Sequence, residues 1–174
     1  MNFSVEMETG TGKTYVYLRT IHELNARYGF TKFIIVVPSV PIREGVLKNL
    51  EITKEHFQNL YGNQPFDYWV YNSKRVSNLR QFANSNQLQI LVINIDAFNK
   101  KYISVIHKEL DGMSGHRPIE FIQATNPIVI LDEPQNMESD KAKDAIASLN
   151  PLCTLRYSSA PRNLYNLLYI LNPF

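Results

Sequence analysis

The sequence predicts an α/β fold with a mostly parallel central sheet flanked by helices. Short runs rich in β-branched and aromatic residues alternate with longer stretches whose apolar residues recur at helical spacing. The runs at residues 32–37 and 127–131 are almost continuously apolar, which is typical of strands buried on both faces. Strands that alternate with helices pair in parallel, because each helix returns the chain to the starting edge of the sheet.

Composition limits the remaining possibilities. A chain of 174 residues is long enough for one domain with a substantial core. Its net charge of +2 is too small to indicate nucleic-acid binding by itself. The single cysteine, Cys153, excludes an internal disulfide and suits a reducing compartment, so we expect a cytoplasmic protein in which Cys153 is a small buried residue. The sequence shows neither a membrane-length apolar run nor a signal-peptide pattern.

The first half of the chain predicts two strand–helix units. A strand at residues 3–7 leads into a glycine-rich loop, and a helix follows over residues 14–28 until Gly29 ends it. The apolar face of that helix is formed by Tyr17, Ile21, Leu24 and Tyr28. After the strand at residues 32–37, a second helix begins near Ile42 and carries Val46, Leu47 and Leu50.

The second half predicts further strands at residues 66–71, 88–94, 127–131 and 152–157. Residues 140–149 predict a helix whose apolar face is Ala142, Ala145, Ile146 and Leu149. Residues 100–125 predict a helix plus a mobile loop around Gly112 and Gly115. The four histidines, at positions 22, 56, 107 and 116, lack metal-ligand spacing and are interpreted as surface or loop residues.

The loop after the first strand has the chemistry of a phosphate-binding loop. Gly10 and Gly12 allow a tight turn in which backbone N–H groups face phosphate oxygens. Lys13 supplies a positive charge for the β- and γ-phosphates, and Thr14 offers a hydroxyl ligand to Mg²⁺ where a helix begins. Met7 stands where the strict pattern has glycine. We therefore predict ATP and Mg²⁺ as ligands of the loop formed by Glu8, Thr9, Gly10, Thr11, Gly12, Lys13 and Thr14.

A partner carboxylate for Mg²⁺ is expected at the end of a neighbouring strand. Asp132 directly follows the apolar run at residues 128–131, at the sheet edge where ligands bind in open α/β folds. Glu133 is then placed to polarise the water that attacks the γ-phosphate. We predict Lys13, Asp132 and Glu133 as catalytic residues, with Thr14 and Asp132 holding the metal. The alternative is that two surface acids cap a strand.

These motifs together resemble a known family. Asp132-Glu133-Pro134-Gln135 is similar to the second signature of superfamily 2 helicases. Combined with residues 7–21 and 33–46, it resembles the Res subunit of type III restriction-modification enzymes over nearly the whole chain. The resemblance implies that residues 1–174 form a single RecA-like P-loop NTPase lobe, the first of two motor lobes. The second lobe and the nuclease domain are then expected outside this chain.

The resemblance implies further site residues. Ser39 and Arg43 match a motif that contacts the nucleic-acid backbone, and their alternative roles are a helix cap and a solvated arginine. Asn94 and Asp96 fall where the family has another DNA-facing segment, and we predict Asn94 as a DNA contact. Ser158 and Ser159 match the motif that couples hydrolysis to DNA movement, although Ala160 and Pro161 depart from its usual Thr and His.

Gln135 lies in the second motif and is predicted to bind the nucleotide or the coupling motif. Its amide cannot titrate, so it is not a candidate general base. The alternative is a loop amide satisfied by the backbone. Six aromatic residues invite a base-stacking interpretation, but their spacing favours core packing; they are Tyr15, Tyr17, Phe66, Tyr68, Trp69 and Tyr71.

Three functions stay open at this point. The first is the ATPase lobe of a type III restriction enzyme, or of another superfamily 2 translocase, which drives DNA translocation and, in the intact restriction enzyme, cleavage. Its partners are then double-stranded DNA, contacted through the backbone, and the modification (Mod) methyltransferase subunit. The second is a lobe that binds nucleotide without turning it over. The third, a P-loop kinase, is disfavoured because no arginine-rich lid is visible and the Asp132–Glu133 pair favours hydrolysis.

Overall fold

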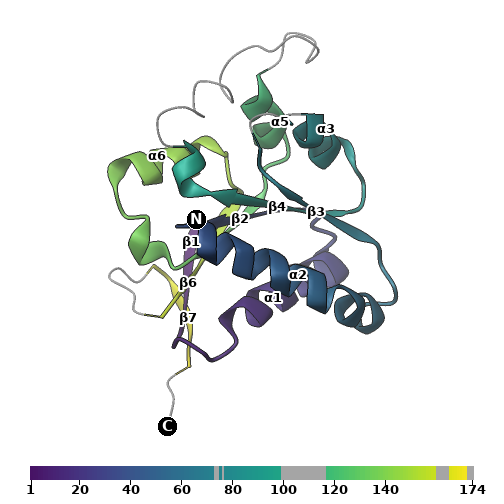
Figure 1. Cartoon of the computed structure of the whole chain (residues 1–174), viewed down its shortest axis with the longest axis horizontal. Helices are drawn as coiled ribbons and strands as arrows, with labels where there is room; N and C mark the ends of the chain where they lie inside the picture. Colours follow the sequence, from purple (N-terminus) through teal and green to yellow (C-terminus); the bar gives the residue numbers. More distant parts are fainter. Residues whose placement is uncertain (73–74, 76, 99–116, 160–164, 172–174) are drawn as a thin grey trace.

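A computed structural model describes residues 1–72, 75, 77–98, 117–159 and 165–171. Its strands are β1 (Asn2–Met7), β2 (Lys32–Val37), β3 (Phe66–Val70), β4 (Leu88–Asn94), β5 (Ile128–Asp132), β6 (Cys153–Ser158) and β7 (Leu167–Leu171). They form one 7-stranded sheet in the order β3-β4-β2-β5-β6-β1-β7, and every pair of neighbours is parallel. The predicted α/β class is therefore confirmed (Figure 1).

Helices cover both faces of this sheet (Figure 1). One face packs against α1 (Lys13–Tyr28) and α2 (Val40–Leu60), and the other against α3 (Ser77–Asn84), α5 (Pro118–Ala124) and α6 (Asp140–Ser148). Two short 3₁₀ turns, η1 (Ile95–Phe98) and η2 (Pro134–Asn136), follow β4 and β5. None of the described helices is long and apolar enough to cross a membrane.

Local sequence signals explain where the two larger helices begin and end. Helix α1 ends at Gly29, whose φ of 75° is left-handed and whose N–H bonds to the carbonyl of Asn25. Helix α2 begins after Ser39, whose hydroxyl accepts a hydrogen bond from the N–H of Ile42, and Pro41 occupies the first turn, where its missing N–H costs nothing. These helices match the prediction within two residues at their starts.

Shorter elements differ more from the prediction. Helix α3, the two 3₁₀ turns and β7 were not predicted, because three to eight residues are too few to show a clear period. Helix α5 lies inside the predicted 100–125 segment. Residues 100–116 of that segment, with Gly112 and Gly115, lie outside the described residues, as do His107 and His116.

Two interpretations of single side chains are wrong. His22 is not a surface residue, because it is 4% exposed among aromatic rings on the inner face of α1. Tyr28 does not belong to the buried face of α1, since it is 70% exposed and Leu18 is buried instead. Cys153 is half-buried rather than fully buried. The predicted packing role of the aromatics is confirmed, because all six lie in or against the two core clusters.

The strand order brings the predicted motifs to one edge of the sheet. Strand β6 lies between β5 and β1, so the chain segments that leave these three strands meet at their carboxyl ends. The register places Asp132 beside Tyr157 and Glu6 beside Ser158. The loop after β1, the acidic pair after β5 and the serines after β6 are therefore neighbours.

Candidate nucleotide-binding site

The loop between β1 and α1 folds as a tight, glycine-dependent turn. Gly10 and Gly12 have φ values of 83° and 84°, a left-handed conformation that side chains other than glycine adopt only with strain. The turn is closed on the carbonyl of Glu8, which accepts hydrogen bonds from the N–H of Thr11 at 3.3 Å and from its hydroxyl at 2.6 Å. Helix α1 starts directly behind this turn, so its N-terminus favours an anion in front of it.

Lys13 forms an ion pair with Glu133, 120 residues further along the chain. The Lys13 ammonium binds Glu133 Oε1, and the two side chains are 10% and 18% exposed. Two charges this well shielded from water are stable only when they are paired and hydrogen-bonded. The pair therefore joins the first residue of α1 to the residue that follows β5.

The Glu133 carboxylate is held by two more side chains. Its Oε2 accepts hydrogen bonds from the amide of Gln135 and from the hydroxyl of Ser159, the latter at 3.0 Å. Ser158 donates to the Gln135 amide oxygen at 2.8 Å. Burial alone raises the pKa of Glu133, but the bonds from Lys13, Gln135 and Ser159 outweigh it and bring the pKa below its ordinary value. Glu133 is therefore an ionised acceptor at neutral pH.

The backbone at Glu133 is bent to present that side chain. Glu133 has φ 55° and ψ 56°, a left-handed conformation that costs about 1–3 kcal/mol for a residue other than glycine. Its N–H bonds to the carbonyl of Tyr157 at 3.0 Å, and its carbonyl accepts the N–H of Asn136 in the η2 turn. Bonds on both sides thus maintain a kink that turns the carboxylate toward the loop.

Asp132 occupies the last position of β5 and is buried, at 4% exposure. The phenol of Tyr17 in α1 donates to its Oδ2 at 3.1 Å. Burial raises the pKa of Asp132 above its ordinary value, although the Lys13 charge and the Tyr17 hydrogen bond act in the opposite direction.

The donor set fits Mg²⁺ held partly by phosphate. Among the described residues, no group of three or more His, Cys, Asp or Glu side chains could hold a metal by itself. Mg²⁺ is usually bound by one or two protein oxygens together with substrate phosphates and water. Asp132 and the hydroxyl of Thr14, one turn before Tyr17 on α1, are oxygen donors of that kind.

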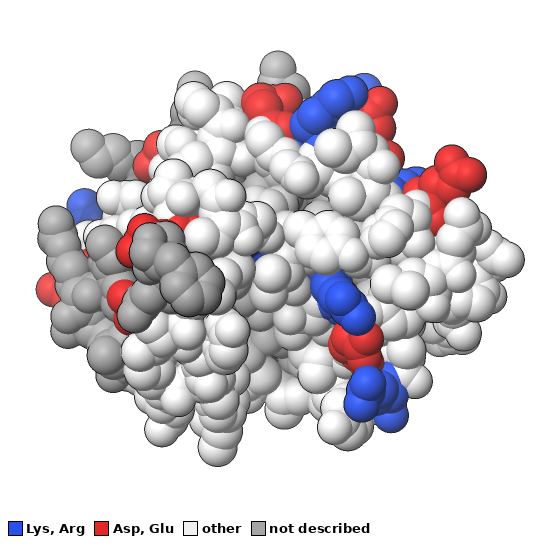
Figure 2. All heavy atoms as spheres, turned by 90° about the horizontal axis from the view of Figure 1, so that it is seen from below, with Lys and Arg blue, Asp and Glu red and all other residues white. Residues whose placement is uncertain are grey.

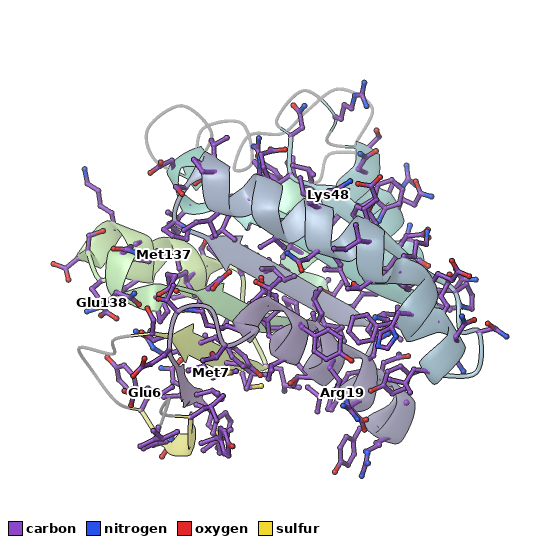
Figure 3. All side chains as sticks on the ribbon, turned by 60° about the horizontal axis from the view of Figure 1, so that its bottom comes forward. Glu6, Met7, Arg19, Lys48, Met137 and Glu138 are labelled. Carbon is purple, nitrogen blue, oxygen red and sulfur yellow. The ribbon has the colours of Figure 1, made fainter. Side chains whose placement is uncertain are left out.

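Arg156, which lies in β6 two residues before Ser158, has a structural partner. Its guanidinium pairs with Glu138, which also binds Lys143 at 3.3 Å, and it stacks over the ring of Tyr165 at 4.8 Å. Figure 3 labels Glu138 in the segment between η2 and α6, on the same side of the molecule as Met7 at the end of β1. The pair therefore ties the segment after β5 to β6 near the site.

The predicted DNA contacts lie in a separate groove. Arg43 and Asn94 line a groove of about 800 Å³ between the start of α2 and the carboxyl ends of β3 and β4. Arg43 bonds to its neighbour Glu44 at 2.7 Å, while Asn94 Oδ1 accepts the N–H of Asp96 at 3.0 Å. Ser39 caps α2. The residues that line this groove include neither Lys13 nor Glu133.

Charged side chains do not by themselves mark a nucleic-acid surface here. On the face drawn in Figure 2, basic and acidic side chains stand next to one another instead of forming a broad patch of one sign. Helix α1 shows the same pattern, because Glu23 lies between Arg19 and Arg27 at ion-pair distances of 4.0 and 2.6 Å.

Sequence analysis did not identify four residues that lie near the site, namely Tyr17, Thr20, Glu138 and Tyr157. Tyr17 was assigned only to the core, yet its phenol reaches Asp132. Tyr157 packs edge-on against the Tyr17 ring at 5.6 Å and bonds to Thr20 at 3.0 Å, and Glu138 holds Arg156. A hydroxyl at position 17, three residues after Thr14, was the one available signal, because residues i and i+3 share a helix face.

Comparison with known proteins shows a consistent similarity. A family model described as "Type III restriction enzyme, res subunit" matches residues 1–163. The Res subunit of the type III restriction-modification enzyme EcoPI from Escherichia phage P1 is 35% identical over 187 residues, covering 95% of this chain. The StyLTI Res subunit from Salmonella typhimurium (strain LT2) and the EcoP15I Res subunit from Escherichia coli are each 32% identical, covering 91% and 95% of this chain.

The chain spans only about a fifth of these relatives. The matched parts amount to 18% of the StyLTI subunit and 19% of each of the other two. The similarity therefore concerns a short part of each of these longer proteins.

Proposed function

The chain belongs to the family of Res subunits of type III restriction enzymes, and we propose that it is the ATP-hydrolysing motor lobe of such a subunit. The family is helicase-like, and the α/β fold with its parallel sheet agrees with a RecA-like lobe. In the intact enzyme, hydrolysis by this lobe drives movement along double-stranded DNA and, through it, cleavage. The Mod subunit of the same system is the proposed protein partner, and the cytoplasm the proposed compartment.

The observation that carries the proposal is the contact between three separate motifs. Lys13 from the loop, Glu133 from the segment after β5 and Ser159 after β6 meet at one carboxylate. A buried structural acid also needs a cationic partner, but that partner need not be the first helical residue behind a glycine-rich turn. The arrangement is what a phosphate-binding loop and a water-activating carboxylate require, namely adjacency at the carboxyl edge of a parallel sheet.

Each residue has a role in hydrolysis. The backbone N–H groups of the loop and the Lys13 ammonium bind the β- and γ-phosphates, so Lys13 exchanges Glu133 for phosphate oxygens when ATP binds. Asp132 and Thr14 are the ligands for Mg²⁺, which neutralises charge on the phosphates. Glu133 accepts the proton of the water that attacks the γ-phosphorus, and ADP leaves as the bond to the γ-phosphoryl group breaks. Gln135 bonds the γ-phosphate or Ser158.

The serines at and after the end of β6 are the proposed coupling residues, and the groove beside α2 is the proposed DNA contact. Ser158 and Ser159 already touch Gln135 and Glu133, so a change at the γ-phosphate is transmitted to the segment after β6. Ala160 and Pro161 lie outside the described residues. Arg43 and Asn94 contact the DNA backbone from their groove and Ser39 from the start of α2, and this binding is independent of base sequence and weakens steeply with salt.

The test is ATP hydrolysis by the chain with and without duplex DNA, using Lys13→Ala and Glu133→Gln. Both substitutions should abolish hydrolysis, and Glu133→Gln should still bind ATP because Lys13 loses its competitor. Hydrolysis that persists in both variants contradicts the assignment. A phosphorylated small molecule as product would show a kinase.

One observation favours the second candidate, a lobe that binds nucleotide without turnover. Arginines usually stabilise the charge that develops during phosphoryl transfer. Among the described residues none contacts Lys13, Asp132 or Glu133, and Arg156 is engaged by Glu138. Tight ATP binding with no hydrolysis, with and without DNA, supports this candidate.

A further inference from the structure

Tyr17 is in an unusual place for a core aromatic residue. Its side chain is 0% exposed, and its phenol donates to Oδ2 of Asp132 at 3.1 Å. The donor belongs to α1, one helical turn after Thr14, and the acceptor belongs to the end of β5. One buried side chain therefore connects the helix that begins at the phosphate loop with the strand that carries the acidic pair.

The other predicted metal ligand, Thr14, lies one helical turn before Tyr17 on the same face of α1. Burial and the Asp132 charge raise the pKa of Tyr17 well above its ordinary value, whereas a hydrogen bond with the Thr14 side chain lowers it. Tyr17 thus bonds directly to Asp132 and lies one turn after Thr14, the two oxygen donors assigned to Mg²⁺.

The ring of Tyr17 is fixed independently of its hydroxyl. It packs edge-on against Tyr157, with centroids 5.6 Å apart, and Tyr157 lies beside Asp132 in the sheet register. The Tyr157 phenol bonds in turn to Thr20 at 3.0 Å, one turn further along α1. Because both rings are held between α1 and β6, the Tyr17 hydroxyl is delivered to Asp132 with little freedom to move.

We propose that Tyr17 is a positioning residue of the proposed magnesium–nucleotide site, which fixes the orientation of the Asp132 carboxylate through its Oδ2 atom. The inference rests on the proposed nucleotide site. Partners that orient a metal ligand typically change metal affinity roughly 10- to 100-fold when they are removed. Tyr17 therefore sets the affinity for Mg²⁺ in the ternary complex, while leaving metal-free nucleotide binding to the loop.

Binding of a fluorescent ATP analogue to Tyr17→Phe, titrated with Mg²⁺ and repeated in EDTA, tests the inference. This variant keeps the ring and removes only the hydroxyl. We expect the Mg²⁺ concentration for half-maximal effect to rise about tenfold. Affinity in EDTA should change less than about twofold, since the loop is untouched. Tyr61→Phe is the matched control: it removes a phenol that bonds to Glu23, away from Asp132, and should leave both measurements unchanged.

A double substitution separates positioning from packing. If Tyr17 acts through Asp132, adding Tyr17→Phe to Asp132→Asn should shift the Mg²⁺ dependence no further. Equal Mg²⁺ dependence of wild type and Tyr17→Phe overturns the inference. The inference is also overturned if Tyr17→Phe shifts the Mg²⁺ dependence of Asp132→Asn as much as it shifts that of the wild type. Failure of the wild-type chain to bind the analogue under any condition instead contradicts the proposed function, so the two failures are distinguishable.

Discussion

The first turns and the middle of helix α1 bury polar side chains in opposite ways. Near its start, Lys13 and Tyr17 each bond to an acidic residue that follows or ends β5. Further along, His22 is buried among the rings of Phe57 and Phe66, and its Nε2 has no hydrogen-bond partner within the described part of the chain. Burial lowers the pKa of His22 to about 4.

The polar groups of Lys13 and Tyr17 bond to residues of the candidate site, whereas the imidazole of His22 is buried in the core without such a bond to Nε2. At the start of α1, buried charges are matched across three elements, which is what a preorganised reaction site needs. At His22, the imidazole stays neutral and packs as one more aromatic ring against α2 and β3. We therefore expect substitutions in the first turns to change nucleotide chemistry, and substitutions at His22 to change stability.

The largest expected effect is on nucleotide affinity in Lys13→Ala. Hydrogen bonds to charged groups contribute about 1.5–3 kcal/mol, so affinity for an ATP analogue should fall roughly 10- to 100-fold. Fluorescence titration measures it. Arg19→Ala, an exposed position on the same helix, is the control and should bind normally. If the affinity of Lys13→Ala for the ATP analogue stays within about twofold of the wild-type value, the start of α1 does not serve nucleotide binding.

His22→Phe should abolish a pH dependence of stability. The folded pKa of about 4 lies below the ordinary value of 6.5, so between them the unfolded chain binds more protons. Stability is thus complete above about pH 6.5 and falls as pH decreases toward 4, by about 2 kcal/mol at pH 5.

Urea unfolding at about pH 5 and pH 8 measures this loss in the wild type and its absence in His22→Phe. His56→Phe removes an exposed histidine from α2 and should retain the wild-type slope. ATP-analogue binding should be unaffected by His22→Phe. If the free energy of unfolding of His22→Phe still falls between about pH 8 and pH 5 as in the wild type, other groups cause the pH dependence.

A smaller effect is expected for Ser159→Ala, which removes one hydrogen bond from Glu133. A net loss of about 1 kcal/mol predicts a roughly fivefold slower ATP hydrolysis with nucleotide affinity unchanged. Ser159→Thr keeps a hydroxyl and should restore most of the rate. A change in affinity without a change in rate would show that Ser159 serves binding instead of the reaction.

The smallest effect concerns the groove, away from both parts of α1. Arg43→Ala should weaken duplex DNA binding roughly two- to threefold and reduce the slope of log affinity against log salt by about one. Glu44→Gln is the matched opposite: it frees Arg43 from its ion pair and should strengthen binding slightly. If the salt slopes of Arg43→Ala and wild type are equal, Arg43 serves only in its ion pair with Glu44, and Ser39 only as the cap of α2.

Local patterns were sufficient for the parts of the site that lie within a few residues of each other. Gly10 and Gly12 predict a left-handed turn, because only glycine enters that conformation without strain, and both have positive φ. An apolar run followed by Asp132 predicts a strand that ends in an acid, and β5 ends there. The alternation of strands and helices predicts the parallel sheet.

Contacts between distant residues needed the folded chain. The pairing of Lys13 with Glu133 depends on β6 lying between β1 and β5, a strand order that no local pattern encodes. Periodicity identifies a helix face, but it does not say what that face meets. The helical spacing of apolar residues predicted that Tyr17 lies in the core, but it did not predict the bond to Asp132. It also did not predict that His22 packs among aromatic rings.

By itself, the sequence determined the glycine-rich turn, the acidic strand end and the α/β class, because each depends on backbone conformation or on periodicity over a short stretch. The tertiary structure decided which polar groups are paired. That decision rests on strand order and register, which bring α1, β5 and β6 together, so that Tyr17 reaches a carboxylate while the Nε2 of His22, five residues later, lies among rings.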